Sequence, residues 1–424
     1  MNVLLLGSGG REFTFAWKFK QSPLLTKLFI APGNGGTDQF GLNLALNPED
    51  FLEVKKAIIE HKIDLVVVGP EGPLVAGIKD QILANENLKS VLVLGPDKLA
   101  AALEGSKDFA KEFMVKYGIP TAAYKTFTAE TLEQGYQFLD SLTAPYVLKA
   151  DGLAAGKGVL ILEDLMEAKK ELNSMLTENK FGEASQTVVI EEFLEGVELS
   201  IFTLTDGENY VVLPEAKDYK RIHDGDKGLN TGGMGAVSPV PFAQGEFLEK
   251  VNEKIIKPTM AGIHAEGYDY SGFVFFGLIN KGGEPYVIEY NVRMGDPETE
   301  VVLPRIDEDL LQLCADAAAG KLESRPLNLL SQTALTVMLV SGGYPESYEK
   351  GKEISGLETI KDGLLIHAGT KHENKQTFTS GGRVISCTAF GNSLEAAQKK
   401  AYQMASLISF QKKFYRKDIG NDLL

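Results

Sequence analysis

The first hundred residues alternate short aliphatic runs with glycine turns, and this pattern constrains the fold more than any other feature. The runs lie at 3–6, 27–30, 65–68 and 91–94, and helix-like stretches separate them. Buried parallel strands read as continuous aliphatic runs because helices cover both faces of their sheet. A glycine-containing turn ends each run, and open parallel sheets bind ligands at the carboxyl ends of their strands. We predict an N-terminal open parallel α/β sheet whose turns share one ligand.

The first of these turns, Gly-Ser-Gly-Gly at 7–10, matches a dinucleotide-binding loop only in part. The third glycine of that motif is missing, because position 12 is Glu12. The second strand runs into Ala-Pro-Gly at 31–33 and not into an acidic residue that reads a ribose. These departures exclude a nicotinamide dinucleotide site. The turn either presents free backbone N–H groups at a helix start to a single phosphate, or is a tight connection without a ligand.

Composition and charge restrict the class of protein. The 424 residues, of which 44% are hydrophobic and 24% charged, suit a globular protein of about three domains. A net charge of -15 argues against a nucleic-acid or anionic-membrane surface but allows a local basic pocket for a small phosphate. The sequence has neither a signal-peptide pattern nor an apolar run near the roughly 20 residues of a membrane span, so we expect a cytoplasmic location. Cys314 and Cys387 are expected to be buried free thiols in a reducing compartment.

Residues 287–300 are the most informative segment for function, because they are predicted to form a strand with one polar face. Strand side chains alternate with period two, which places Glu289, Asn291 and Arg293 on the same side. The side chains expected to face a core are those of Ile288, Tyr290 and Val292. A carboxylate and an amide oxygen suit Mg²⁺, and a guanidinium beside them can hold an anionic intermediate. The segment predicts phosphoryl transfer; the alternative is a solvated edge strand.

A glycine-rich hairpin follows a predicted strand that ends in Lys149. Its tip carries Gly156, Lys157 and Gly158, but the sequence lacks the Ser or Thr of a Walker A loop. Such a tip can lie over a triphosphate, because backbone amides and ammonium groups approach anionic oxygens closely. The alternative is a mobile hairpin with solvated lysines.

An acidic segment follows the aliphatic strand at 188–190 and is typical of a hinge that reads adenine. Backbone groups around Leu194 can pair with a purine edge, and Glu198 can accept hydrogen bonds from ribose hydroxyls. The alternative for this segment is a solvated acidic turn.

Three further elements are predicted. Capping residues indicate a helix that begins after the N-cap Ser106 and stops at Gly118. The segment 218–235 is too rich in glycine for regular structure and too long for an idle connection, so we expect an irregular substrate-binding loop. Residues 271–280 and 284–291 are predicted to form a hairpin.

The order of these motifs resembles that of the ATP-grasp ligases, and within them the phosphoribosylamine-glycine ligase family, also called glycinamide ribonucleotide synthetases. The motifs that carry the resemblance are Gly-Ser-Gly-Gly-Arg-Glu at 7–12, Ala-Pro-Gly-Asn at 31–34, Leu-Glu-Gly-Ser-Lys at 103–107, Lys-Ala-Asp-Gly-Leu-Ala-Ala-Gly-Lys-Gly at 149–158, Asn-Thr-Gly-Gly-Met-Gly-Ala at 230–236 and Arg-Met-Gly-Asp-Pro-Glu-Thr at 293–299. Similar matches at 367–370 and 381–384 extend the resemblance over almost the entire chain.

The resemblance implies an α/β and α+β multidomain fold with three domains. These are an N-terminal parallel α/β domain at 1–105, an ATP-grasp domain at 106–325 with a glycine-rich lid subdomain at about 122–192, and a small C-terminal α+β domain at 326–424. It also implies that ATP phosphorylates the carboxylate of glycine, and that the amine of 5-phosphoribosylamine attacks the resulting glycyl phosphate. The products are glycinamide ribonucleotide, ADP and phosphate, in de novo purine biosynthesis.

The resemblance also implies the roles of individual residues. Arg293 is expected to stabilise charge on the transferred phosphoryl group, while Glu289 and Asn291 bind Mg²⁺ or Mn²⁺. The residues expected to hold ATP are Lys107, Lys149, Gly156, Lys157, Gly158, Glu191, Glu192, Leu194 and Glu198. The residues expected to hold glycine and phosphoribosylamine are Gly9, Gly10, Asn34, Asp218, Asn230, Thr231, Gly232, Gly233, Met234 and Asp296.

Three positions depart from the usual family pattern. Phe13 stands where the family usually has His, and Lys217 and Tyr219 replace the usual Gln and His. Phe13 is expected to pack in a core with Phe15 and Phe19, whereas the other two lie nearer the substrates. Two alternatives remain: another ATP-grasp purine-pathway ligase, such as a formyltransferase or carboxylase, and a non-catalytic nucleotide sensor. Neither nucleic acid nor membrane is expected as a partner.

Overall fold

The N-terminal part of the computed structural model, which describes residues 1–154 and 158–424, is an open parallel sheet with helices. Its elements are β1 (Asn2–Gly7), α1 (Gly10–Phe19), β2 (Lys27–Pro32), β3 (Leu42–Asn43), α2 (Phe51–His61), β4 (Leu65–Val68), α3 (Glu71–Val75), α4 (Ile78–Leu83), β5 (Leu92–Pro96) and α5 (Lys98–Gly105). The strands pair in parallel in the order β5-β4-β1-β2-β3. The parallel sheet predicted from the aliphatic runs is confirmed, and the short edge strand β3 is an addition to it.

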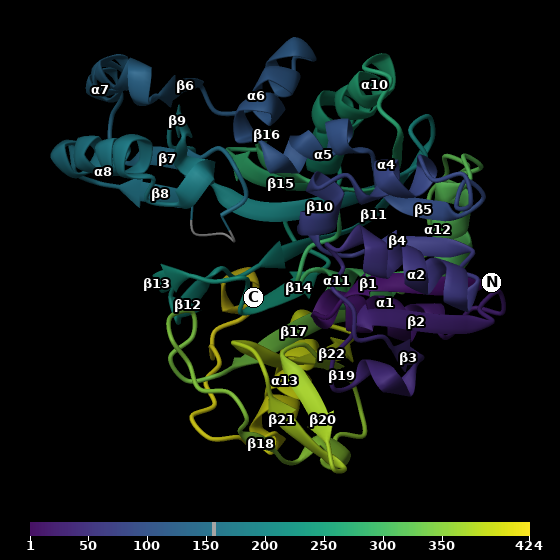
Figure 1. Cartoon of the computed structure of the whole chain (residues 1–424). Coiled ribbons are helices and arrows are strands. Elements are labelled where there is room, and N and C mark those ends of the chain that lie inside the picture. Colours follow the sequence, from purple (N-terminus) through teal and green to yellow (C-terminus); the bar gives the residue numbers. More distant parts are fainter. Residues whose placement is uncertain (155–157) are drawn as a thin grey trace.

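A four-stranded antiparallel layer with two helices projects to one side of the body (Figure 1). The elements of this region are α6 (Lys107–Lys116), β6 (Tyr124–Thr128), α7 (Leu132–Ser141), β7 (Tyr146–Ala150), β8 (Val159–Leu162), α8 (Leu165–Glu178) and β9 (Thr187–Glu191). The sheet order is β6-β9-β7-β8, and α7 and α8 share a separate hydrophobic core with it. The predicted cap of α6 is confirmed, because Ser106 Oγ accepts the N–H of Phe109 at 3.1 Å.

The remaining central residues build long antiparallel strands that join the N-terminal sheet. Their elements are β10 (Val197–Thr205), β11 (Tyr210–Asp218), β12 (Arg221–His223), β13 (Lys227–Asn230), β14 (Gly235–Ser238), α9 (Glu246–Val251), α10 (Lys257–Ala265), β15 (Tyr270–Lys281), β16 (Glu284–Asn291), α11 (Thr299–Val302) and α12 (Leu310–Ala318). β15 pairs with β10, with β16 and, at its beginning, with β5. The predicted hairpin of β15 and β16 is confirmed, and it joins directly to the N-terminal layer.

The C-terminal residues extend the same sheet. Their elements are β17 (Thr333–Val340), β18 (Glu353–Ile354), β19 (Leu364–His367), β20 (Thr370–Glu373), β21 (Gln376–Thr379), β22 (Arg383–Gly391) and α13 (Leu394–Leu407). β14 pairs with β17, so the described residues include one sheet of 13 strands from β3 to β19. β18, β20 and β21 form a small separate sheet. Cys314 and Cys387 are buried free thiols, as predicted.

Two local predictions are wrong. The segment 218–235 is not irregular, because β12 and β13 pair in an antiparallel hairpin whose turn has positive φ at Gly225 and Asp226. Its glycines supply turn geometry inside regular structure. The predicted strand 287–300 ends at Asn291, beyond which the chain bends into a short helical segment.

A β-bulge changes the alternation of side chains along β16. Gly277 pairs with Glu289 while the next residue, Leu278, pairs with Val287, so Ile288 is the extra residue. Val287 therefore joins the core with Tyr290, and Ile288 is half-buried at a cavity wall beside Glu289. For this reason Ile288 does not join the main core with Tyr290, contrary to expectation, but packs against the small buried cluster of Ala122, Leu194 and Ile279. No helix in the described ranges is both long and apolar enough to cross a membrane.

Candidate functional site

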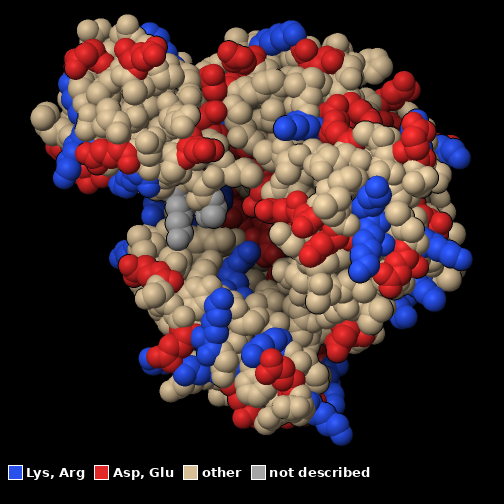
Figure 2. Space-filling model, in the orientation of Figure 1, with Lys and Arg blue, Asp and Glu red and all other residues tan. Residues whose placement is uncertain are grey.

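Two connected hollows lie where the N-terminal turns, the projecting layer and the end of β16 meet. The first, of about 700 Å³, is called the deep cavity; it is lined by the turns after β1 and β4, by α5 and α6, and by the residues around Asn291. The second, of about 530 Å³, is called the side groove and is lined by residues of β7 to β10 and of the β12–β13 hairpin. Lys220, Asp218 and Glu289 belong to both linings. Figure 2 shows a hollow near the middle of this face with acidic groups in its depth.

Arg293 is held at the deep cavity by carboxylates from two helices. Its Nη2 lies 2.8 Å from Glu104 Oε1, and its Nε lies 3.4 Å from Glu71 Oε2. Nη2 also donates to Asn291 Oδ1 at 3.3 Å. Burial opposes the charge of Arg293, yet Glu104 and Glu71 raise the pKa of the guanidinium above its ordinary value. Burial raises the pKa of Glu104, and the nearby Arg293 opposes this rise. The cation is thus fixed in position before any ligand arrives.

Glu289 and Asn291 line the deep cavity and supply one carboxylate and one amide oxygen. This donor set fits a hard divalent cation that keeps several waters and takes further oxygens from phosphates. The residues that the structure describes contain no cluster of three His, Cys, Asp or Glu able to hold a metal. The two residues are therefore suited to a metal that arrives with a phosphate ligand.

Two predicted lysines reach the hollows from α6 and β7. Lys107 lines the deep cavity, and burial lowers the pKa of its ammonium despite the nearby Glu289. Lys149 lines the side groove, and its Nζ lies 2.9 Å from Glu191 Oε2. Lys111, which the sequence did not indicate, lies 3.2 Å from the other oxygen of Glu191, and burial lowers the pKa of Lys111 to about 8. Glu191 thus anchors two ammonium groups at the boundary of the two hollows.

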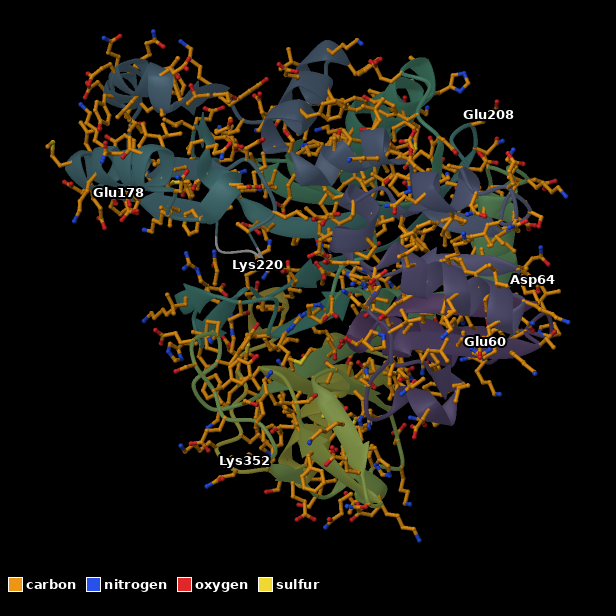
Figure 3. All side chains as sticks on the ribbon, in the orientation of Figure 1. Glu60, Asp64, Glu178, Glu208, Lys220 and Lys352 are labelled. Carbon is orange, nitrogen blue, oxygen red and sulfur yellow. The ribbon has the colours of Figure 1, made fainter. Side chains whose placement is uncertain are left out.

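The acidic segment after β9 lines the side groove, as expected for a nucleotide-reading hinge. Glu192, Leu194 and Glu198 all belong to its wall. Glu198 Oε2 accepts from Lys220 Nζ at 2.6 Å, and Lys220 holds the pKa of Glu198 below its ordinary value. Figure 3 labels Lys220 between the projecting layer and the β12–β13 hairpin. Gly158 lines the deep cavity, whereas the predicted residues Gly156 and Lys157 lie outside the described residues.

The residues predicted to hold the substrates divide into two groups. Those that line a hollow are Gly9, Asp218, Asn230, Thr231, Gly232 and Asp296. The structure places the other four, Gly10, Asn34, Gly233 and Met234, outside the linings. Met234 packs in the C-terminal core, and Asn34 Nδ2 donates to the carbonyls of Ser8 and His367 at 2.9 and 2.8 Å. Asn34 therefore joins the first turn to the C-terminal part.

The helix start at Gly9 differs from the prediction of free backbone donors. The N–H of Gly9 donates to Glu12 Oε2 at 2.6 Å, and the N–H of Arg11 donates to Asp296 Oδ2 at 3.3 Å. Carboxylates are favourable at a helix N-terminus for the same reason as phosphates, so they occupy these donors here. The prediction that these two N–H groups are free is wrong.

Several charged residues of the deep cavity were missed by sequence reasoning. They are Arg11, Glu71, Glu104, Lys220, Glu298 and Arg383. Arg383 Nη1 lies 3.0 Å from Asp296 Oδ1, and Arg383 and Arg11 hold the pKa of Asp296 below its ordinary value against the effect of burial. The available signal was the position of Glu104 and Glu298 inside motifs that already carry the family resemblance.

The three unusual positions have defined surroundings. Phe13 is buried, as predicted. It stacks on His367 at 5.7 Å and contacts Phe40 edge-on at 5.1 Å, and Phe40 packs against the core that holds Phe15 and Phe19.

The other two unusual positions share one partner. Lys217 Nζ lies 2.6 Å from Asp422 Oδ2, and the Tyr219 hydroxyl donates to Asp422 Oδ1 at 2.5 Å. Lys217 and Asp422 both line the side groove. A segment close to residue 424 is thereby fixed to the wall of the groove.

Comparison with known proteins places this geometry among nucleotide-dependent ligases. Models of the phosphoribosylglycinamide synthetase N domain, ATP-grasp (A) domain and C domain match residues 1–104, 105–299 and 334–422. A phosphoribosylamine--glycine ligase of Salmonella typhimurium is 45% identical over 99% of this chain and 98% of its own length. The crystal structure of a phosphoribosylamine--glycine ligase from Thermotoga maritima superposes with a TM-score of 0.86 and 38% identity, covering 99% of this chain and 100% of that one.

A more distant structural neighbour shares the fold alone. The biotin carboxylase domain of Hydrogenobacter thermophilus 2-oxoglutarate carboxylase, determined with MgADP, ADP and bicarbonate, has a TM-score of 0.72 at 16% identity. It covers 97% of this chain and 91% of its own chain.

Proposed function

Because this chain belongs to the phosphoribosylglycinamide synthetase family, we propose that it joins glycine to 5-phosphoribosylamine at the expense of ATP. It is an ATP-dependent carbon-nitrogen ligase of de novo purine biosynthesis. Glycyl phosphate is the intermediate, and glycinamide ribonucleotide, ADP and phosphate are the products. Two buried free thiols agree with a reducing compartment, and we place the reaction in the cytoplasm.

The observation that carries this proposal is the group Glu289, Asn291 and Arg293 at the junction of the two hollows. Glu289 lines both hollows, and Asn291 and Arg293 line the deep cavity. A nucleotide in the side groove therefore directs its phosphates toward a metal-binding pair and a fixed guanidinium. This arrangement suits phosphoryl transfer, which depends mainly on positioning and electrostatic stabilisation.

ATP is assigned to the side groove and its phosphates to the boundary. Glu192, Leu194 and Glu198 hold the nucleoside, while Lys107, Lys149 and Gly158 contact the phosphates. Gly156 and Lys157 keep the same proposed role from the sequence. Glu289 and Asn291 would hold Mg²⁺ or Mn²⁺, which when bound neutralises negative charge on the phosphate oxygens.

The two other substrates are assigned to the deep cavity. Asp218, Thr231 and Gly232 position glycine with its carboxylate toward Arg293, and Asn230 supports them from the adjoining side groove. Gly9 and Asp296 lie on the side of the first turn, which we propose for phosphoribosylamine. Arg293 stabilises the charge that develops on the transferred phosphoryl group, and the enclosed walls limit hydrolysis of the acyl phosphate.

Four of the residues predicted to hold the substrates line neither hollow. Gly10, Asn34, Gly233 and Met234 are proposed to shape the substrate walls from behind. We also retain the division into domains at 1–105, 106–325 and 326–424 as a proposal, with a lid subdomain at about 122–192.

A coupled assay of ADP formation tests the function. ADP release is expected only when glycine and phosphoribosylamine are both present, and formate or bicarbonate in place of glycine should give only background. Release with formate or bicarbonate would support another ATP-grasp ligase. Calorimetric binding of ATP without glycine-dependent turnover would support a nucleotide sensor instead.

A further inference from the structure

Two buried carboxyl groups, those of Asp218 and Glu298, line the deep cavity. Neither is assigned to metal or phosphate. Asp218 ends β11, and Glu298 immediately precedes α11. Both line the cavity, and Glu298 is only 4% exposed. Glu298 Oε1 accepts from the Ser200 hydroxyl at 3.4 Å. A buried carboxyl that faces a reaction cavity is suited to handle a proton.

The charges around Glu298 come from residues at or near the ends of three strands. Asp218 and Lys220 lie at and beyond the end of β11, with Lys220 Nζ 3.6 Å from Asp218 Oδ1. Arg293 follows β16, and Arg383 begins β22. Burial and then the Asp218 carboxylate raise the pKa of Glu298 to about 7, while Lys220 and Arg293 oppose that rise.

The pKa of the Asp218 carboxyl is shifted in the same direction. Burial raises this pKa, and the nearby Lys220 opposes the rise. Two carboxyls that repel each other in a buried site lose their protons in separate steps, which favours a state in which only one of them is charged. Such a pair can exchange a proton without leaving two uncompensated charges.

The proposed reaction requires a proton acceptor that the phosphate-binding groups do not provide. When the amine attacks the carbonyl carbon of glycyl phosphate, a C–N bond forms and the C–O bond to phosphate breaks. The phosphate leaves with the electron pair of that bond and takes up one proton to become HPO4²⁻, while the nitrogen must lose one proton. A base in the cavity can accept this proton from the nitrogen and pass it to the leaving phosphate. Arg293, Lys107 and Lys149 are cations or donors and cannot serve as the base at their ordinary charge.

We propose that Glu298, which lines the deep cavity together with Asp218, accepts the proton that the attacking amine loses when the C–N bond forms. This inference rests on the proposed function. Glu298 and Arg293 both line the deep cavity, so the base shares the cavity with the acyl phosphate whose formation Arg293 promotes. The negative charge of Asp218 raises the affinity of Glu298 for this proton. Glu298 acts in the second half of the reaction and leaves the first half to the metal and phosphate groups.

The test separates the two halves of the reaction in the full-length protein with Glu298→Gln. Hydroxylamine traps glycyl phosphate as the hydroxamate, which measures the first half, and glycinamide ribonucleotide formation measures the whole. We expect hydroxamate formation within about threefold of wild type and ligation lower by about 10² or more, as for loss of a general base. The wild-type ligation rate should rise with pH through about 7, and Glu298→Gln should lose this acidic limb.

A matched control is Glu300→Gln, because Glu300 is also buried and acidic but lies outside the lining of the deep cavity. Its ligation and hydroxamate rates should both stay within about twofold of wild type. Glu298→Asp keeps a carboxyl and should retain the acidic limb at a lower rate, which decides the question if Glu298→Gln does not fold.

Three results would overturn the inference. The first is an equal fall of both rates in Glu298→Gln, which indicates a structural role. The second is ligation by Glu298→Gln within threefold of wild type, or loss of the acidic limb in a folded Glu298→Asp. The third is a wild-type protein that forms neither hydroxamate with glycine and hydroxylamine nor ADP with glycine and phosphoribosylamine. This result removes the proposed function itself and is thereby distinguished from the other two.

Discussion

The deep cavity and the side groove share a wall but are built differently. In the deep cavity, charged side chains from distant segments fix one another, as Arg293 is fixed by Glu71 and Glu104. In the side groove, the lining follows successive strands and the segments between them, and the Glu198–Lys220 pair is close to half-exposed on both sides. The difference indicates that the deep cavity, which we propose for bond formation, has preset electrostatics, whereas the groove proposed for the nucleotide is built mainly from strand geometry.

The largest expected effect comes from removing the central cation of the deep cavity. Arg293→Ala should lower turnover by about 10² or more and leave ATP affinity within several-fold, because the guanidinium acts mainly on the transition state. It should also lower the free energy of unfolding by about 3 kcal/mol, since Glu104 is left buried without its partner. Steady-state kinetics, ATP titration and denaturant unfolding measure the three quantities.

A double variant separates the two roles of Arg293. Adding Glu104→Gln should recover most of the lost stability but none of the turnover. An unchanged rate in Arg293→Ala, or recovery of the rate in the double variant, would contradict the contrast between the two hollows.

The next effect concerns the residue common to both hollows. Glu289→Gln removes a charged metal ligand but keeps the shape of the side chain, so the metal concentration for half-maximal rate should rise by about tenfold. Turnover should fall to background when a chelator removes the metal from either protein. A Mg²⁺ titration that overlaps the wild-type curve would exclude Glu289 as a ligand.

A smaller effect is expected in the side groove. Asp422→Ala removes the acceptor of both Lys217 and Tyr219, which are largely buried, and should lower the free energy of unfolding by about 1–2 kcal/mol. The KM for ATP should rise several-fold while kcat stays within twofold, because only the groove wall loosens. A fall in kcat with an unchanged KM would show that this contact serves the deep cavity.

The smallest effect is a dependence of stability on pH. Burial and then Asp296 raise the pKa of Glu300 from 4.5 to about 8 in the folded protein. The folded state thus binds the proton more tightly than the unfolded state, and this group lowers stability as pH rises from about 4.5 to 8. Glu300→Gln should be more stable than wild type by about 1–2 kcal/mol at pH 8 and nearly equal at pH 5. Unfolding curves that give the same stability difference between Glu300→Gln and wild type at pH 5 and at pH 8 would contradict this expectation.

The contrast between long-range contacts and local strand geometry also explains which parts of the fold and of the site could be predicted from the sequence. The parallel sheet, the cap of α6 and the hairpin of β15 and β16 depend on local pattern, and they were found. Glu289, Asn291 and Lys149 belong to short motifs on single strands, so their shared location could be inferred. The role of Glu104 as partner of Arg293 depends on an approach between residues 189 positions apart, for which the alternation of side chains carries no signal.

Local irregularities set a second limit. The bulge at Ile288 moves one side chain from the core side to a cavity wall, although apolar alternation predicts the reverse. The β12–β13 hairpin was mistaken for irregular loop, because glycines that favour turns were counted against pairing. In both places a local departure from regular strand geometry decides the outcome.

The contact of Asp422 with Lys217 has a consequence for folding during synthesis on the ribosome. The two partners are separated by 205 residues, so Asp422 leaves the ribosome long after the strand that it secures. During synthesis the groove lacks this wall while the N-terminal sheet is already available to fold. A nascent chain stalled before residue 422 should therefore hold nucleotide more weakly than the released protein.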